Sequence, residues 1–482
     1  MNITKLAFQE NLPFIHVQQM ITACKLFFCA ALITLTGCAT FPYSSNNDID
    51  TDCEINDTNS KKLNHNWLFR TDPNNVGLLL EWNNYVENKE GWVESTPGKP
   101  WEDSGFDYDG VAWYITEITL PDWPTAYLGF GKIDDSATMW INGTHIDTWT
   151  DIGSESVLVD LTKHGKARDE LYLSIRIDDY GGFGGIKQPI ILGRDPREVV
   201  TPLQYTILQA STHPNWPMPS WSKNEPYSWT MTGNTNTSEE ALVSSDGTVA
   251  PWAKAPRAEI WIYNPSEKRL SYADPNRIVF SLSNSSIPIP TWEWKSADLT
   301  VSNTLFGDNN NAAIRWKVKL TNSSNKHTAF TMLLSVRPLA TNADSAPICN
   351  IRLQRNRRMW VNNKPFLVSN IAAKHTGVSL LENAMYAALD GTVPSSKVTS
   401  TTYNGDLASV WAYPVNLEPG QATEFHFAFP DSPGSDFPII ETSIDQHISE
   451  AVVHWNQAAG KVSLALPDQS VQNGLNASIG YL

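Results

Sequence analysis

The chain is poor in cysteine and lacks a long apolar segment. Its five cysteines among 482 residues match neither a disulfide framework nor a zinc-binding spacing; they are Cys24, Cys29, Cys38, Cys53 and Cys349. A single Cys53–Cys349 bridge stays open as an alternative. The main apolar run near the N-terminus, Leu26 to Leu35, is shorter than the roughly 20 residues that a transmembrane helix needs. The sequence therefore argues against a disulfide-rich module and against a membrane-spanning helix there.

Basic residues are also scarce. The 35 lysines and arginines are outnumbered by 51 aspartates and glutamates, which gives a net charge of −16. A nucleic-acid-binding surface usually needs a basic patch, often interleaved with aromatic residues, and the sequence contains no such run. Nucleic acid is thus excluded as an expected partner, and the acidity is typical of a soluble surface outside the cytoplasm.

The N-terminal segment has the pattern of an export signal. The run from Leu26 to Leu35 fits the apolar region of a signal peptide. Its end, Leu35-Thr36-Gly37-Cys38, resembles a bacterial lipobox, which implies removal of residues 1–37 and lipidation of Cys38. An ordinary signal peptide is the alternative. Residues 38–62, rich in Asn, Asp, Ser and Thr, are expected to form a flexible tether. Together with the lipobox resemblance, this predicts a lipoprotein of the outer membrane or cell surface.

Alternating apolar residues dominate the rest of the chain. Leu171, Leu173, Ile175 and Ile177 would share one face of a strand, and Asn142-Gly143 after a strand pattern is a strong hairpin signal. The predicted fold class is mainly β, with a jelly-roll sandwich over residues 63–196 and a larger sandwich over 197–432. The period changes to that of helices in residues 433–482, where Ser443 and Gln446 form a capping-box pattern.

A set of short motifs recurs through the first domain: Tyr108-Asp109-Gly110, Ala112-Trp113-Tyr114, Gly129-Phe130-Gly131 with Asp134-Asp135, Trp140, Asn142-Gly143, and the glycine-rich Asp178 to Ile186. With these motifs, the stretch from Asp109 to Gly143 resembles the sugar-binding, galactose-binding-like jelly roll at the front of glycoside hydrolase family 2 enzymes. The resemblance covers about 125 residues and implies a carbohydrate-related module. It does not specify the sugar.

Two aromatic loops are candidate carbohydrate contacts. In the first domain, Trp101 is followed by Glu102 and Asp103, so that a ring could stack on a pyranose while carboxylates bind its hydroxyls. In the second, a proline-stiffened loop carries Trp216 and Trp221. For both loops the alternative is structural packing of the tryptophans.

Further patterns favour structural roles. Trp292 and Trp294 would share one face of a strand with Glu293 on the other, which predicts core packing. The basic run from Arg352 to Arg358 is expected to be a solvated edge strand. Asp134, Asp135, Asp178 and Asp179 are weak candidates for a structural Ca²⁺, with capped turns as the alternative. No other cofactor is expected.

The C-terminal part supports a second resemblance. Arg337-Pro338, Pro419-Gly420 and the segment from Trp455 to Leu482 resemble the end of a β-sandwich, a helical linker and the first helix of a six-hairpin (α/α) glycosidase barrel. The catalytic carboxylates of such enzymes lie in the barrel, and no residue here matches them. We therefore expect the non-catalytic front part of an exported, lipid-anchored glycoside hydrolase whose barrel is missing from this chain. A complete carbohydrate-binding lipoprotein and a structural surface protein are the alternatives.

Overall fold

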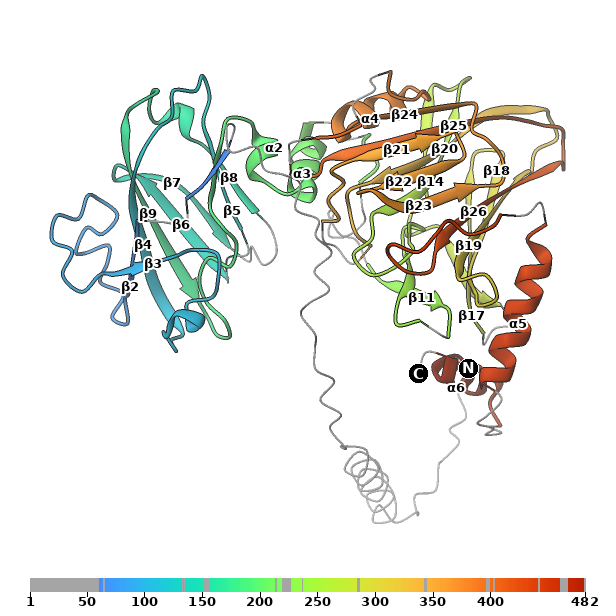
Figure 1. Ribbon diagram of the computed structural model, residues 1–482, viewed down its shortest axis with the longest axis horizontal. Coiled ribbons are helices and arrows are strands. Elements are labelled where there is room, and N and C mark those ends of the chain that lie inside the picture. The colour runs from blue at the N-terminus through green and yellow to red at the C-terminus, as the bar shows by residue number, and fades with distance from the viewer. Residues whose placement is uncertain are drawn as a thin grey trace, which may run out of the picture. The chain divides into compact units, whose positions relative to one another are not determined.

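The computed structural model describes residues 60–480, except 64–65, 132, 134, 151–155, 213–214, 219–226, 236, 284–286, 342–344, 396–398, 402–403, 441–442 and 460–466. It confirms the mainly β fold class: four sheets, in which every ladder between named strands is antiparallel, contain most of the regular structure. Figure 1 shows strands β2–β9 in one sandwich and strands β11–β26 in another. Cys38 and the signal-peptide pattern lie outside the described residues. Within the described ranges, no helix is both long and apolar enough to cross a bilayer.

The first sandwich consists of a six-stranded and a four-stranded sheet. The six-stranded sheet has the order β3 (Val93–Ser95), β2 (Trp67–Thr71), β4 (Gly110–Thr119), β9 (Glu170–Asp179), β6 (Ser136–Ile141), β7 (Thr144–Thr150). The four-stranded sheet has the order β1 (Ser60–Lys62), β10 (Ile191–Gly193), β5 (Tyr127–Gly131), β8 (Ser156–Asp160). Two short 3₁₀ turns, Glu102–Ser104 and Leu161–Lys163, join strands.

The local patterns explain this sandwich. Leu171, Leu173, Ile175 and Ile177 of β9 are buried in its core, as their alternation predicts. The Asn142-Gly143 hairpin is confirmed, since both residues have positive φ and Ile141 pairs with Thr144. The sheet begins earlier than expected, because residues 60–62 pair with β10. These three residues belong to the sheet and not to a tether.

The second sandwich has two eight-stranded sheets. The first has the order β11 (Trp229–Gly233), β12 (Glu240–Ser244), β13 (Val249–Ala250), β14 (Arg257–Asn264), β20 (Thr328–Arg337), β25 (Leu407–Leu417), β24 (His375–Leu380), and β15 (Arg269–Ser271) also pairs with β14. The second has the order β16 (Val279–Ser283), β17 (Ile287–Ser296), β18 (Leu299–Asp308), β19 (Ala313–Asn322), β26 (Ala422–Pro430), β23 (Lys364–Ser369), β22 (Arg358–Val361), β21 (Ile351–Gln354).

Tryptophan side chains of the second of these sheets form part of the core between the two sheets. Trp292 stacks on Trp316 with ring centroids 6.3 Å apart, and Trp294 is buried in the same core. Glu293 is exposed, so the predicted alternation along β17 is confirmed. The prediction of a solvated edge strand over Arg352 to Arg358 is confirmed in part: β21, at the edge of the sheet, carries the exposed Arg352. It is wrong for the middle of the run, where Arg355 and Asn356 have positive φ and form the turn between β21 and β22.

In the part of the chain that the structure describes, five α-helices flank the sheets. They are α2 (Pro196–Val199), α3 (Pro202–Thr212), α4 (Leu381–Leu389), α5 (Asp445–Ala459) and α6 (Gln469–Gly480). The predicted helical period is confirmed by α5, whose Ala451 and Trp455, with Ile444 just before the helix, pack against Ile287 and Phe306 of the sheet. The helix begins at Asp445, one residue later than a Ser443 cap would place it, and Gln446 Nε2 donates to Glu450 Oε1 at 2.8 Å. In Figure 1, α5 runs alongside the sandwich near β17. Helices α3 and α4 have no counterpart among the sequence predictions.

The segment between the sandwiches is anchored by polar contacts. Asn404 Nδ2 donates to the carbonyl oxygens of Glu198 at 3.0 Å and Val200 at 3.2 Å. The Tyr205 hydroxyl donates to Glu382 Oε2 at 2.9 Å. Cys349 is disulfide-bonded, and the other four cysteines all precede the described residues. The Cys53–Cys349 alternative therefore stays a prediction.

Candidate functional site

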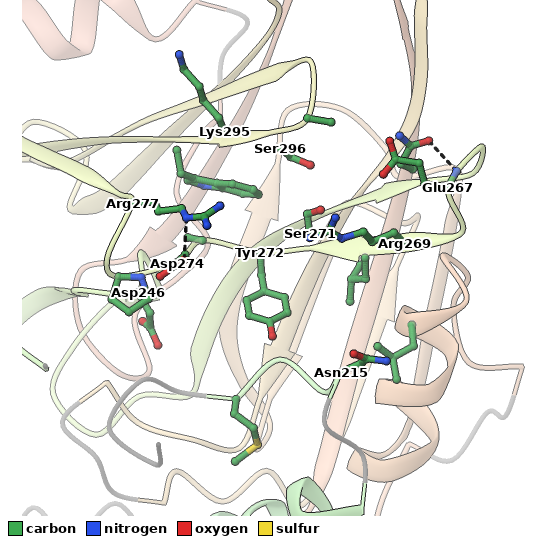
Figure 2. A pocket seen from close by; sticks show the side chains of 18 of the residues that line it. Asn215, Asp246, Glu267, Arg269, Ser271, Tyr272, Asp274, Arg277, Lys295 and Ser296 are labelled. Carbon is green, nitrogen blue, oxygen red and sulfur yellow. Dashed lines mark hydrogen bonds and ion pairs between the residues drawn. The ribbon is translucent and has the colours of Figure 1, made fainter. Parts of the chain in front are cut away.

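An open pocket of about 1010 Å³ lies on the second sandwich. Its walls come from both sheets: β15 and the following residues 272–277 on one side, and the hairpin between β17 and β18 on the other. Asn215, Met218 and Leu389 complete the lining from outside the sheets. Figure 2 shows Tyr272 projecting into this space. The volume is at the upper end of the range for small-molecule sites.

Two tight turns shape the first wall. Asn264 Oδ1 accepts a hydrogen bond from the backbone N–H of Ser266 at 3.0 Å, which turns β14 back into β15. Farther along, Asp274 Oδ1 accepts from the N–H of Asn276 at 2.9 Å, and the Asp274 carbonyl accepts from that of Arg277. These side-chain bonds replace sheet bonds where the strand ends and give the pocket rim a defined backbone.

The opposite wall is the end of the β17–β18 hairpin. Ser296 pairs with Leu299, so that only two residues form the connection, and Ala297 has the positive φ of such a turn. Trp294 is buried beneath this wall, whereas Lys295 on the other face of the strand is exposed. The alternation of β17 therefore puts an aromatic ring under the pocket and a cation at its rim.

The central feature of the pocket is Tyr272. This side chain is half-buried and packs on the core cluster that contains Trp261 and Leu333. A ring supported in this way keeps one orientation, which lowers the entropy lost when a ligand stacks on it. Ser271 and Asn276 also line the pocket and offer hydrogen-bonding groups there.

A buried ionic cluster lies under the pocket. Asp246 Oδ2 pairs with Arg257 at 2.8 Å, and Arg257 Nε lies 2.9 Å from Glu259 Oε1. Glu259 in turn binds Arg337 through both carboxylate oxygens at 2.7–2.8 Å. Burial acts to raise the pKa of Asp246, but the charge of Arg257 and hydrogen bonds from Ser244 and Thr248 outweigh it and lower the pKa. Asp246 is thus held ionised and already paired.

The charges around the rim are mixed. Lys268, Arg269, Arg277 and Lys295 are exposed cations, and Glu267 is an exposed anion. Arg277 Nε lies 3.4 Å from Asp274 Oδ2, a solvent-exposed ion pair of little energetic value. Among described residues, neither Lys268 nor Arg269 makes an ion pair.

The loop predicted from Trp101, Glu102 and Asp103 lies on the first sandwich. Trp101 is only 2% exposed, and its Nε1 donates to the Tyr108 carbonyl at 2.9 Å, so the packed alternative describes its position. Both Glu102 carboxylate oxygens accept from the Gly184 N–H, at 3.0 and 3.1 Å. Asp103 is exposed. A sugar contact by this loop stays a prediction.

The loop that contains Trp216 and Trp221 contributes to the pocket, but through residues other than these tryptophans. Trp216 is 1% exposed and stacks on Tyr386 at 6.0 Å between ring centroids. Trp221 lies outside the described residues. Asn215 and Met218, on either side of Trp216 in the sequence, line the pocket instead. Sequence reasoning missed Tyr272 and Arg269; an aromatic residue just before the Asp274-Pro275-Asn276 turn signal is the pattern that could have indicated them.

The described calcium candidates are engaged in local bonds. Asp135 Oδ2 accepts from the N–H of Tyr180 at 2.5 Å, and Asp179 Oδ1 from that of Gly181 at 3.0 Å. Asp178 Oδ1 pairs with Arg176 at 2.6 Å. Asp134 lies outside the described residues. Over the part of the chain that the structure describes, no group of three or more His, Cys, Asp or Glu side chains is arranged to hold a metal ion.

The sequence matches no known protein family and no curated protein. Among solved structures, a Ruminococcus gnavus β-glucuronidase is similar over 64% of this chain and 46% of its own, with 13% identity and a TM-score of 0.25. A β-glucuronidase of an uncultured Clostridium sp. is similar over 64% and 47%, with 14% identity and a TM-score of 0.25. The chain spans about half the length of these structures. Likeness at this level carries no argument about activity, so the proposals below rest on the pocket.

Proposed function

We propose that this protein is a carbohydrate-binding component of an exported glycoside-degrading system and that the pocket around Tyr272 is its binding site. The observation that carries the proposal is a half-buried aromatic ring, supported by the core, in an open pocket lined by polar and charged side chains. An aromatic face packs against the C–H face of a pyranose, while polar neighbours replace the water bound to its hydroxyls. The pocket volume accommodates more than one sugar residue.

The role in this proposal is binding without catalysis. Glycoside hydrolysis needs two carboxyl groups about 5 to 9.5 Å apart, one of them protonated as the acid. Asp246, the buried carboxylate at the pocket floor, has a lowered pKa and is paired with Arg257. Glu267 lies on the exposed β14–β15 turn. This arrangement favours ligand binding over acid–base chemistry.

The proposal includes export and attachment to a membrane through Cys38, as the lipobox resemblance implies. In this proposal the chain is the front part of a longer glycoside hydrolase. A complete cell-surface carbohydrate-binding lipoprotein is the second candidate, because the same pocket would serve it without a barrel. The two candidates differ in the gene sequence that follows residue 482, where helical-hairpin periodicity would favour the first.

A glycan array with Tyr272→Ala and Tyr272→Phe tests the pocket. We expect the alanine variant to lose binding and the phenylalanine variant, which keeps the stacking ring, to retain most of it. Tyr180→Ala is the matched control, because Tyr180 is 77% exposed on the first sandwich. If Tyr180→Ala abolishes binding and Tyr272→Ala does not, the binding site lies on the jelly roll and the proposed site is wrong.

A further inference from the structure

The pocket concentrates positive charge on a protein that is strongly acidic. Four of its lining residues are basic, Lys268, Arg269, Arg277 and Lys295, although acidic residues outnumber basic ones by 51 to 35 in the whole chain. In Figure 2, Arg269 and Arg277 lie on opposite sides of Tyr272 in the view shown. Both arginines come from the same wall as the tyrosine, Arg269 from β15 and Arg277 from the turn after it.

The acidic side chains of the lining leave much of this charge uncompensated. Asp246 is buried and balanced by Arg257 in the ionic cluster below. Asp274 lies 3.4 Å from Arg277, but the side chains are 44% and 84% exposed, so this pair is easily exchanged for a ligand. That leaves Glu267 against Lys268 and Arg269, neither of which has an ion-pair partner among the described residues.

Arginines beside an aromatic ring suit a particular kind of sugar. A guanidinium presents a planar pair of N–H donors that matches the two oxygens of a carboxylate or sulfate, whereas neutral hydroxyls need no such cation. With the ring of Tyr272 available for stacking, the arginines can reach acidic groups on the sugar bound there or on its neighbour along the chain.

We infer that the pocket selects acidic glycans, whose sugar residues carry carboxylate or sulfate groups, a conclusion that rests on the proposed carbohydrate-binding function. The acidic groups pair with Arg269 and Arg277, and Lys268 adds longer-range attraction. Because these cations are exposed, the selectivity weakens as salt rises from 0.05 to about 0.5 M.

The test compares glycans that differ only in charge, using the full chain and isothermal titration calorimetry. One pair of probes is an oligogalacturonate and its methyl ester, and the other is a sulfated galactan oligosaccharide and its desulfated counterpart. We expect the acidic member of at least one pair to bind about tenfold or more tightly than its neutral partner at low salt. The pair that shows the difference distinguishes carboxylate from sulfate recognition.

Variants locate the effect. Arg269→Gln with Arg277→Gln should remove the preference for the acidic glycan, so that the acidic and neutral members of the pair bind with similar affinity. The matched control is Arg168→Gln with Arg355→Gln: Arg168 makes an exposed ion pair with Asp122, as Arg277 does with Asp274, and Arg355 is an exposed arginine on a turn. The control has the same net charge and should bind like the wild type.

The outcomes separate the two proposals. Equal binding of acidic and neutral glycans, both lost in Tyr272→Ala, would overturn the charge selectivity and keep carbohydrate binding at the pocket. A preference that survives in the Arg269/Arg277 variant, or that disappears equally in the control, would also overturn it. Absence of binding to every probe would count against both proposals.

Discussion

Gly184 lies so close to Trp101 that a Cβ atom added to it would be 2.1 Å from Cζ2 of the indole. The backbone N–H of Trp101 also donates to the Gly184 carbonyl at 3.1 Å, and the backbone N–H of Gly184 donates to the carboxylate of Glu102. The glycine-rich segment after β9 therefore covers the ring of Trp101. Position 184 requires glycine because a larger side chain would collide with that ring.

Gly184→Ala should destabilise the protein by about 1–3 kcal/mol, because the added methyl group overpacks a buried ring and the backbone held against it. The measurement is the free energy of unfolding from denaturant titration. Gly474→Ala in α6 is the control, since nothing lies within 4 Å of its added Cβ, and it should be neutral or slightly stabilising. Equal stability of both variants would mean that the segment around Gly184 shifts to accommodate the methyl group at no cost.

Asp406 should make stability fall as pH rises. Burial raises its pKa from 3.8 to about 6, against the opposing charge of Arg197 and the hydrogen bond from Thr401, and its Oδ2 has no hydrogen-bond partner among the described residues. A group with a raised folded-state pKa stabilises the protein below its unfolded pKa, and this contribution is lost as pH rises through about 6. The shift corresponds to a difference on the order of 3 kcal/mol.

Asp406→Asn tests this dependence, because the amide stays neutral at every pH. Relative to the wild type, the free energy of unfolding of the variant should rise between pH 4 and pH 8, by up to about 3 kcal/mol. Thermal unfolding at several pH values measures the change. A difference between variant and wild type that is constant across this range would contradict the assignment to Asp406.

Glu259→Gln should be strongly destabilising. The substitution leaves Arg257 and Arg337 buried with Asp246 as the remaining charge partner in the cluster, and an uncompensated buried charge typically costs about 3–5 kcal/mol. A second variant that combines Glu259→Gln with Arg337→Met removes both charges of one pair and should be less destabilised than the sum of the single changes. Additive effects in this double-mutant cycle would show that the pair is not coupled.

A fragment of residues 60–200 should unfold cooperatively and at a higher temperature than a fragment of residues 63–196. The longer fragment keeps β1, which pairs with β10, and also Val199 and Val200, which pack on Tyr127 and Ile191. Circular dichroism melts of both fragments provide the comparison. Identical melting temperatures would mean that these flanking contacts contribute nothing to the sandwich.

Cys38→Ser should release the protein from the membrane fraction of cells that process bacterial lipoproteins. Several acyl chains on Cys38 would bury enough methylene groups, at about 0.8 kcal/mol each, to anchor the protein stably. The control is Cys29→Ser, within the segment that a signal peptidase would remove. If the wild type and Cys38→Ser distribute alike between fractions, the lipid anchor is disproved.

The sequence by itself determined the fold class and several local structures. Strict alternation placed Leu171 to Ile177 and the tryptophans of β17 in the cores, because side chains of a strand point alternately to its two faces. Asn142-Gly143 determined a hairpin, and the helical period of Ile448, Val452 and Trp455 indicated α5, since both signals depend on neighbouring residues alone.

The tertiary structure alone decided the pocket. Tyr272 directly follows β15 of one sheet, Trp294 lies in β17 of the other, and the two residues are 22 positions apart, so only the packing of the sheets makes them line one space. Packing also decided which aromatic rings are covered. Tryptophan is a residue type that can stack on sugars, yet Gly184 lies against the ring of Trp101 and Tyr386 lies against the ring of Trp216. Whether a ring is exposed depends on what covers it from distant parts of the chain, and this information is absent from any local pattern.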